Sequence, residues 1–286
     1  MNLLIIQHAR KGSTQVDYMA KATISPFWAP ARLGRTIINA IHELGAGFVF
    51  FLSGVRHMFT WPLQVQKAVQ QVYFIGVKSI FVILLVSLFT GMVLGLQLYY
   101  TLVKFGSEGV LGAAVALSII RELGPVLTAI MIIGRAGSAM AAEIGIMRIT
   151  EQIDALFTMD INPIRYLISP RIVASLICFP LLTAMFDVIG IMGGYLTGVV
   201  LLGINPGVFF SRMDTLVVFA DVSGGFIKAL VFGIIVVIIC CYQGFFVHQR
   251  PESHGAKGVS LATTRAVVFS SVAVLISDYV LTSLLL

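Results

Sequence analysis

Long apolar runs separated by short polar segments dominate the hydropathy pattern of this chain of 286 residues. A helix needs about twenty apolar residues to cross the roughly 30 Å hydrocarbon core of a bilayer. Helices are favoured there because they satisfy their own backbone polar groups. Five runs meet this requirement, at about residues 79–100, 115–142, 168–202, 226–247 and 265–286. The pattern therefore predicts an all-α polytopic membrane protein with about five transmembrane helices.

A shorter apolar stretch precedes the first of these runs. Residues 44–63 are rich in Phe and Trp, but Arg56 and His57 interrupt them. This marginal length and the interruption favour an N-terminal helix that lies in the membrane interface. Residues 1–43 are rich in Lys and Arg, and we expect them to form a cytoplasmic segment. Residues 44–286 would then be a single transmembrane domain.

The longest polar insertion between two apolar runs extends from Glu143 to Pro163. Residues 146–157 within it place apolar side chains three to four positions apart, with charged and amide side chains between them, which is typical of an amphipathic helix. Pro163 ends the insertion, because proline cannot continue a helix. We expect a short helix on the membrane face that can transmit force to a soluble partner. Its apolar positions are Ile146, Ile149, Ile153, Leu156 and Phe157.

Composition supports the membrane assignment and limits the other classes. Apolar residues make up 58% of the chain and charged residues only 11%, whereas roughly a quarter of the residues in soluble domains are charged. The three cysteines lie in apolar runs, and no Cys or His spacing indicates a metal site. The chain has neither a phosphate-binding GxxxxGK[ST] loop nor a nucleophile elbow. ATPase or hydrolase chemistry is therefore not expected in this chain.

The distribution of basic residues predicts the orientation. If the N-terminus is cytoplasmic, the N-terminal region and the inner loops hold fourteen of the 19 Lys and Arg residues, and the outer segments hold three. This positive-inside bias places the polar insertion in the cytoplasm and the C-terminus on the outer side. The net charge of +6 reflects this loop bias, so no nucleic-acid partner is indicated.

Glycines spaced by four residues occur on two of the predicted spans. Such small-xxx-small faces allow helix backbones to approach closely in a membrane. We expect tight helix packing at both faces and consider each a candidate for a contact between two copies of the chain. The faces are Gly91 and Gly95 on the first span, and Gly190, Gly194 and Gly198 on the third.

Three blocks of sequence carry a family resemblance. They read RELGPVLTAIMIIGRAGSAMAAEIGIMRITEQIDAL from Arg121, DINPIRYLISPR from Asp160, and ATTRAVVFSSVAVLISDYVLTSLL from Ala262. Over roughly residues 65–286 the chain resembles the MlaE/YrbE-type permeases, the ABC-transporter membrane subunits that work with MCE-domain proteins. The first 40 residues do not contribute to this resemblance.

The resemblance implies a homodimeric permease of the bacterial inner membrane. Its implied partners are an ABC ATP-binding subunit, an MCE-domain substrate-binding protein and a phospholipid or similar hydrophobic substrate. ATP and Mg²⁺ would bind to the ATPase, and this chain would bind no cofactor. The segment that matches residues 146–157 is implied to be the coupling helix. Its expected contacts with the ATPase are Met147, Arg148, Glu151, Gln152, Asp154 and Leu156.

Charges within the predicted spans give the sequence's own indication of a substrate site. Arg121 and Glu122 lie about 30 Å along the helix from the predicted inner end of the second span, at Ala142. Charges at such depths are costly unless they are paired or face water. One interpretation is a substrate site in which Arg121 binds a lipid phosphate. We assign Arg121, Glu122, Gln97 and Tyr100 to that site.

The other interpretation of these charges is structural. Arg121 or Arg135 would pair with Glu122, Asp187 or Asp278, and we assign Arg135, Asp187 and Asp278 to a buried charge network. An alternative function is an ion-coupled secondary carrier or an intramembrane enzyme that uses Glu122, Asp187 and Asp278. Such carriers show related halves or paired broken helices, and five spans without an internal repeat argue against one.

Overall fold

The computed structural model describes residues 38, 45–54, 56, 64–249 and 255–285. The chain divides into two units, Met1–Ser53 and Gly54–Leu286. A short apolar helix begins at Gly45 in the first unit and ends at Gly54, the first residue of the second. The predicted basic segment 1–43 lies outside the described residues apart from residue 38. Residues 44, 55 and 57–63 of the predicted interfacial helix also lie outside them, so its place in the interface stays a prediction.

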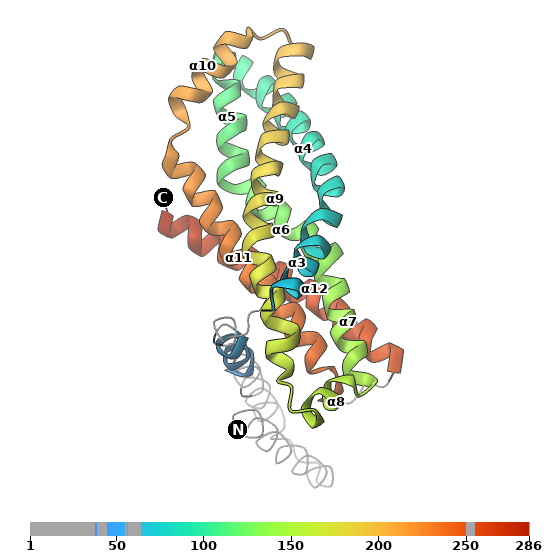
Figure 1. The fold of residues 1–286 in the computed structure, drawn as a ribbon. Coiled ribbons are helices and arrows are strands. Elements are labelled where there is room, and N and C mark those ends of the chain that lie inside the picture. Colours follow the sequence, from blue (N-terminus) through green and yellow to red (C-terminus); the bar gives the residue numbers. More distant parts are fainter. Residues whose placement is uncertain (1–37, 39–44, 55, 57–63, 250–254, 286) are drawn as a thin grey trace, which may run out of the picture. The chain divides into compact units, whose positions relative to one another are not determined.

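The second unit is a bundle of helices, and the described residues contain no strand (Figure 1). Five helices are long and apolar enough to cross a membrane, which confirms the predicted fold class. All five begin before the predicted spans, and the first two also end beyond them, because polar turns continue a helix past the apolar core. Their bounds are Val65–Val103, Glu108–Ile149, Ile164–Leu201, Phe219–Phe245 and Gly255–Leu285.

The first three spans are each assembled from consecutive helical segments. The α-helices of the first two spans are α3 (Val65–Val72), α4 (Lys78–Val103), α5 (Leu111–Ser118), α6 (Gly124–Ile132) and α7 (Ser138–Ile149). Single π-helical turns join them at Tyr73–Val77, Ile119–Leu123 and Ile133–Gly137. The remaining helices are α8 (Gln152–Thr158), α9 (Ser169–Tyr195), α10 (Pro206–Leu216), α11 (Phe219–Phe245) and α12 (Gly255–Leu285). π-Helical turns often occur at functional sites, and two of these carry an arginine.

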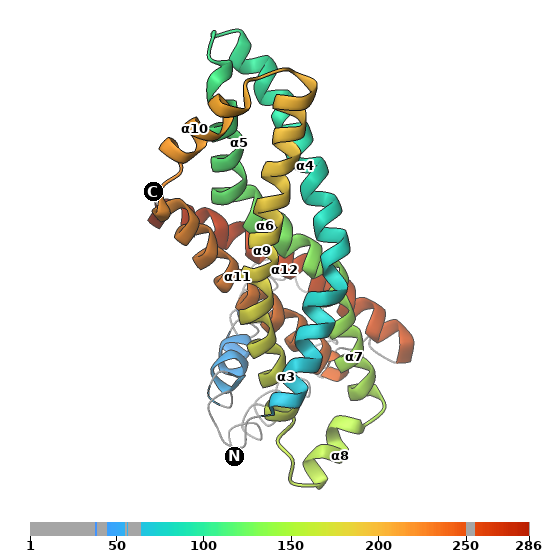
Figure 2. The same ribbon diagram turned by 45° about the horizontal axis from the view of Figure 1, so that its top comes forward.

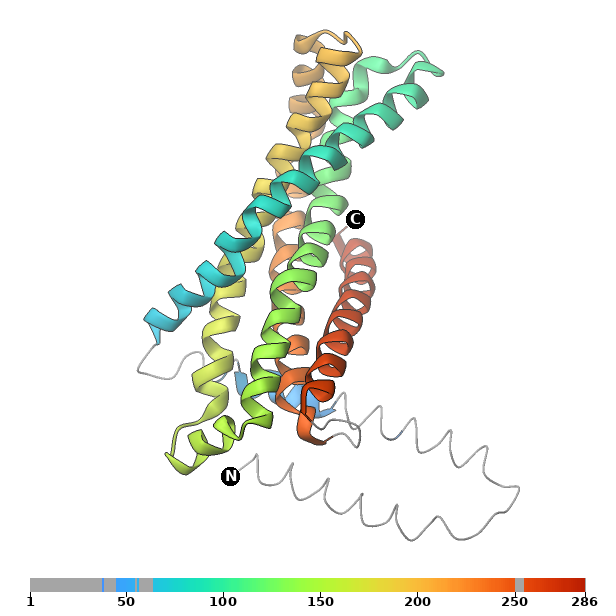
Figure 3. The same cartoon turned by 90° about the vertical axis from the view of Figure 1, so that its right-hand side faces the viewer.

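Within the bundle, α9 packs against α4 on one side and against α11 on the other. Helix α11 also contacts α7 and α12. Figure 3 shows α4 crossing the bundle obliquely, with α12 on the opposite side. The short helices α8 and α10 lie at opposite ends of this unit (Figures 1 and 2). We refer below to the α8 end and the α10 end.

The two glycine faces meet each other inside one chain. A Cβ atom at Gly91 would collide with the carbonyl oxygen of Gly190, and one at Gly95 would lie 3.3 Å from the Cα of Gly194. The Thr197 hydroxyl donates a 3.2 Å hydrogen bond to the Met92 carbonyl across the same interface. These faces therefore join α4 to α9, and the expectation that they are candidates for a contact between two copies was wrong.

The predicted amphipathic helix over residues 146–157 is two helices. Helix α7 ends at Ile149, and Glu151 then adopts a left-handed backbone with φ 59° before α8 begins. This conformation ends the first helix, so the apolar positions do not form one face. Ile153 is fully buried, whereas Ile146 and Phe157 are exposed. The sequence periodicity does not reveal this break, because glutamate rarely adopts the left-handed backbone conformation.

We predict that Gly91→Ala destabilises the protein by about 1–3 kcal/mol, because its Cβ must displace a backbone carbonyl. The matched control is Gly134→Ala, where no heavy atom lies within 4 Å of the added Cβ. That variant should be neutral or slightly more stable, since alanine favours helix over glycine. Thermal unfolding of both purified variants in detergent tests this expectation. Equal unfolding temperatures for the two would show that α4 and α9 do not pack through their glycines.

Candidate functional site

Pro125 leaves a backbone carbonyl in the middle of the second span available to accept a hydrogen bond from another helix. Proline has no N–H, so it cannot donate to the carbonyl four residues earlier, that of Arg121. In the preceding π-helical turn, the Gly124 N–H donates to the carbonyl of Ile119. The Arg121 carbonyl instead accepts a 2.9 Å hydrogen bond from Lys228 Nζ of α11. The proline of the second span thus frees a carbonyl that binds the lysine of the fourth span.

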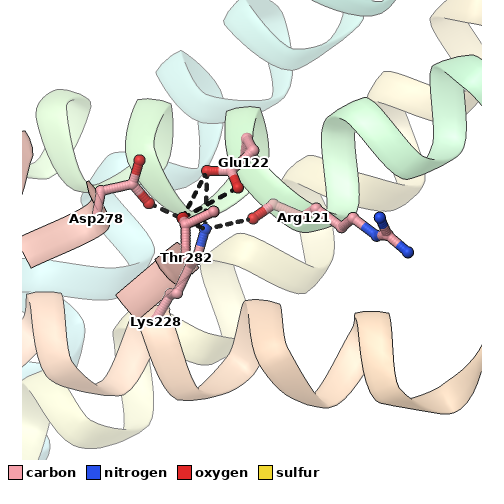
Figure 4. A network of polar contacts seen from close by, with 5 residues as sticks. All are labelled: Arg121, Glu122, Lys228, Asp278 and Thr282. Atoms are coloured by element: carbon pink, nitrogen blue, oxygen red, sulfur yellow. Dashed lines mark hydrogen bonds and ion pairs between the residues drawn. The ribbon is translucent and has the colours of Figure 1, made fainter. Parts of the chain in front are cut away.

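Lys228 joins three spans through its ammonium group (Figure 4). Besides the Arg121 carbonyl, Nζ donates to Glu122 Oε2 at 2.8 Å and to Thr282 Oγ1 at 2.7 Å. Asp278 Oδ1 lies 3.1 Å away as a further ion-pair partner. Thr282 also donates to Glu122 Oε1 at 3.1 Å. We call Glu122, Lys228, Asp278 and Thr282, together with the Arg121 carbonyl, the Lys228 cluster.

The Lys228 cluster holds two carboxylates and one ammonium. An ammonium has three N–H donors, and all three are directed to other acceptors. Asp278 Oδ1 accordingly makes no hydrogen bond and interacts with Lys228 only as an ion pair. The Lys228 side chain is 3% exposed, whereas that of Glu122 is 42% exposed. The cluster is therefore buried at its cation and open at Glu122.

The Arg121 side chain points away from the Lys228 cluster, although its carbonyl belongs to it (Figure 4). Its Nη2 and Nε lie 2.6 and 2.7 Å from Asp221 Oδ1. The other Asp221 oxygen accepts the Val218 N–H at 3.0 Å, where α11 begins. A charge-assisted contact to one carboxylate neutralises the guanidinium. Arg121 is thus tied to the first turn of α11 and is still about two-fifths exposed.

The structure separates the charges that the sequence grouped into one network. Asp278 joins the Lys228 cluster, whereas Arg135 donates to the Phe74 carbonyl and the Ser79 hydroxyl. Asp187 packs with Oδ1 against Gly124 and makes no hydrogen bond through that oxygen. The prediction that Arg135, Asp187 and Asp278 form one network is therefore corrected. Each lies at a different position in the bundle.

Sequence reasoning missed two residues of this site. Lys228 is one of the three basic residues that the orientation argument assigns to the outer segments, although a lysine nine residues into the fourth apolar helix already indicates a buried partner. Asp221 was overlooked in the first turn of the same helix. Gln97 and Tyr100 lie on the exposed face of α4, which contributes no residue to the Lys228 cluster. Their assignment to a substrate site stays a prediction.

At the α8 end, Arg148 connects three elements. Its Nη1 lies 2.6 Å from Asp154 Oδ1 of α8, and its Nε donates to His248 Nδ1 at 2.9 Å. The guanidinium carbon lies 5.8 Å from the ring centre of Phe245, the last residue of α11. The Arg148 side chain is 6% exposed, whereas that of Asp154 is 52% exposed. A buried arginine therefore ties the exposed helix α8 to the end of α11.

The other residues predicted to contact an ATPase lie around Arg148. Glu151 and Gln152 are exposed, and Met147 and Leu156 are half-buried. Within the part of the chain that the structure describes, no group of three His, Cys, Asp or Glu side chains could hold a metal ion. The α8 end thus presents polar and apolar side chains on a short helix with a buried ionic anchor.

Residues 68–284 match the family model described as permease MlaE. The chain belongs to the MlaE permease family. It is 44% identical over 260 residues to the intermembrane phospholipid transport system permease protein MlaE of Haemophilus influenzae, covering 88% of this chain and 95% of that protein. A probable ABC transporter permease protein of Rickettsia bellii is 41% identical over 252 residues, with the same coverage.

The proteins similar to this chain include a plant protein. The protein TRIGALACTOSYLDIACYLGLYCEROL 1, chloroplastic, of Arabidopsis thaliana is 38% identical over 273 residues, covering 95% of this chain and 75% of that protein. Membership in the MlaE family makes the chain a multi-pass permease, that is, a transporter membrane subunit and not a catalytic enzyme. The Lys228 cluster and the α8 end are accordingly the two sites at which to look for transport chemistry and for coupling.

We predict that Lys228→Met destabilises this MlaE-family permease by about 3 kcal/mol, because it leaves buried carboxylate charge without its cation. The triple variant Lys228→Met, Glu122→Gln, Asp278→Asn should recover most of that loss, since no unpaired charge remains. Folded yield and thermal unfolding in detergent measure both effects. If the single variant is as stable as the wild type, Lys228 does not hold the three spans together.

Proposed function

We propose that this chain is the transmembrane subunit of an ABC transporter that moves phospholipids or similar hydrophobic molecules between the inner membrane and the cell envelope. The observation that carries the proposal is that one helix, α11, contributes residues both to the Lys228 cluster and to the contacts at the α8 end. Its first half carries Asp221 and Lys228, and its last residue, Phe245, contacts Arg148. The 17 residues from Lys228 to Phe245 span about 26 Å.

The energy source in this proposal is a separate ATP-binding subunit that docks on α8. The support is the short helix itself, which exposes Gln152, Asp154 and Phe157 and buries Ile153. Displacement of α8 would move Arg148 through its ion pair with Asp154, and hence the end of α11. ATP and Mg²⁺ would bind to that partner subunit, so this chain would bind no cofactor itself.

The substrate site in this proposal is centred on Glu122, a member of the Lys228 cluster, and on the neighbouring Arg121 side chain, each about two-fifths exposed. A guanidinium can bind a phosphate through two parallel hydrogen bonds. Arg121 would exchange Asp221 for a lipid phosphate when α11 moves. Gln97 and Tyr100, exposed on α4, would contact the lipid on its path. The phospholipid substrate named for the Haemophilus influenzae relative supports this choice of ligand.

The assembly completes the proposal. Five spans are few to enclose a lipid, so the chain would act as a homodimer, with an MCE-domain protein at the α10 end. The excess of Lys and Arg supports an orientation with the α8 end and the N-terminus in the cytoplasm and the C-terminus on the outer side. The glycine faces are occupied between α4 and α9, so another surface must form the dimer contact.

The alternative of an ion-coupled carrier or intramembrane enzyme has less support. It requires Glu122, Asp187 and Asp278 to act together. Glu122 and Asp278 share Lys228, whereas Asp187 packs against Gly124. Membership in a permease family also argues for transport rather than catalysis.

Co-purification with an ATP-binding subunit and ATP-driven lipid transfer in proteoliposomes test the proposal as a whole. We predict that Asp154→Asn retains the ATPase subunit but transports severalfold less lipid per ATP hydrolysed, because α8 loses its ion pair with Arg148. The matched control is Asp160→Asn in the same segment, where asparagine accepts the backbone φ of 58°. Unchanged coupling in Asp154→Asn would contradict the role of this ion pair.

Arg121 allows a test that separates headgroup binding from ion pairing. Arg121→Ala alone leaves Asp221, 8% exposed, without its cation and should lower folded yield. The double variant Arg121→Ala, Asp221→Asn removes both charges and should fold. We predict that the double variant assembles with the ATPase but transports little lipid. Normal transport by the double variant would show that Arg121 acts only as an ion-pair partner.

A further inference from the structure

Arg135 differs from the other cations inside the bundle. It lies in the π-helical turn Ile133–Gly137, fourteen residues after Arg121 on the same span and about 20 Å nearer the α8 end. Among the described residues no carboxylate lies within ion-pair distance of it, whereas three other cations of the bundle have such a partner. Those pairs are Arg121 with Asp221, Lys228 with Glu122, and Arg171 with Glu143.

One nitrogen of Arg135 is held rigidly. Its Nη1 donates to the Phe74 carbonyl and to Ser79 Oγ, each at 2.7 Å. The Phe74 carbonyl is available because the first span has a π-helical turn there, in which the Lys78 N–H donates to the Tyr73 carbonyl instead. The Phe74 ring lies 5.3 Å from the guanidinium carbon. These contacts fix the plane and direction of the guanidinium.

The other edge of the guanidinium is open. A guanidinium has five N–H donors, and Nη1 uses two of them. The remaining three belong to Nε and Nη2, which make no hydrogen bond to the described residues and are not buried. The Nε and Nη2 side presents two parallel N–H groups, the geometry that binds a phosphate or carboxylate through two hydrogen bonds. Gly134 beside it is exposed, with no heavy atom within 4 Å of its Cβ position.

The depth of Arg135 indicates what occupies that edge. Ser79, its partner, begins the charge-free apolar run of the first span, and the exposed Lys78 immediately precedes it. Arg135 therefore lies in the α8-side part of the apolar region, about 10 Å along the helix from Ala142, the predicted inner end of its span, and its long side chain can reach toward lipid phosphates there. A cation at this depth must be paired or hydrated. A lipid phosphate supplies the missing negative charge in the required geometry.

We propose that Arg135 binds the phosphate of a phospholipid in the leaflet at the α8 end. It is a second headgroup site on the span that carries Arg121. The inference rests on the proposed lipid substrate and adds a headgroup-binding site in the opposite leaflet. A lipid that enters or leaves at the α8 end is held by Arg135, and one at the other leaflet by Arg121.

The test places a photoreactive p-benzoylphenylalanine at Gly134, where neighbouring atoms leave room. The complete complex is illuminated in nanodiscs of phosphatidylethanolamine and phosphatidylglycerol, without ATP, and the mass of the chain is measured. Benzophenone inserts into C–H bonds, so a lipid gives an adduct and free phosphate does not. We expect a phospholipid adduct that falls on the order of tenfold in Arg135→Gln, as the loss of a bidentate charged contact implies, and partly in Arg135→Lys.

Lys78→Gln is the matched control, because it removes a neighbouring exposed cation whose side chain, among the described residues, contacts only the rings of Tyr73 and Phe74. Its adduct should be retained. An equal loss in Lys78→Gln would indicate diffuse attraction to a basic surface and overturn the site. An adduct with a second copy of the chain in place of lipid would also overturn it. The ATPase that co-purifies with the same sample is scored separately, so failure of the proposed function remains distinguishable.

Discussion

The cost of charge in a membrane is the constraint on which this structure depends. Lys228 can remain buried in α11 only because the second and fifth spans surround it with acceptors, two of them carboxylates. One of these acceptors, the Arg121 carbonyl, is available because Pro125 has no N–H to donate to it. A proline, a π-helical turn and a lysine a hundred residues away therefore form one unit, and three spans cannot separate without exposing its charges.

The rest of the bundle follows from close packing around that unit. Glycine contacts join α4 to α9, and α9 packs against α11, so all five spans are connected to the helix that carries Lys228. Helix α11 ends at Phe245, beside Arg148 and the exposed helix α8. In the proposed mechanism, movement at one end of this helix disturbs the ionic contacts at the other. This arrangement suits a permease that receives energy at one membrane face and uses it near the other.

The sequence was sufficient for the spans and for a short helix at the α8 end, because apolar run length and amphipathic spacing are local properties. It was insufficient for the pairing of charges. The choice of Asp221 rather than Glu122 as the partner of Arg121 depends on how the first turn of α11 sits beside the second span. The break at Glu151 was also missed, since a left-handed glutamate has no sequence signature. The sequence likewise does not show that the two glycine faces pack against each other within one chain; only their contacts in the structure do.

The central claim, that transport needs the charges of the Lys228 cluster, is tested most directly with a variant in which the cluster carries no charge. The measurement is ATP-driven phospholipid transfer by the Lys228→Met, Glu122→Gln, Asp278→Asn variant, reconstituted with its ATPase subunit. This variant keeps the packing of the three spans and removes the ionic contacts that α11 would break and reform. The account predicts a folded, assembled complex that hydrolyses ATP and transfers little lipid. Transfer at the wild-type rate would contradict it, because the ionic contacts would then serve only to hold the bundle together.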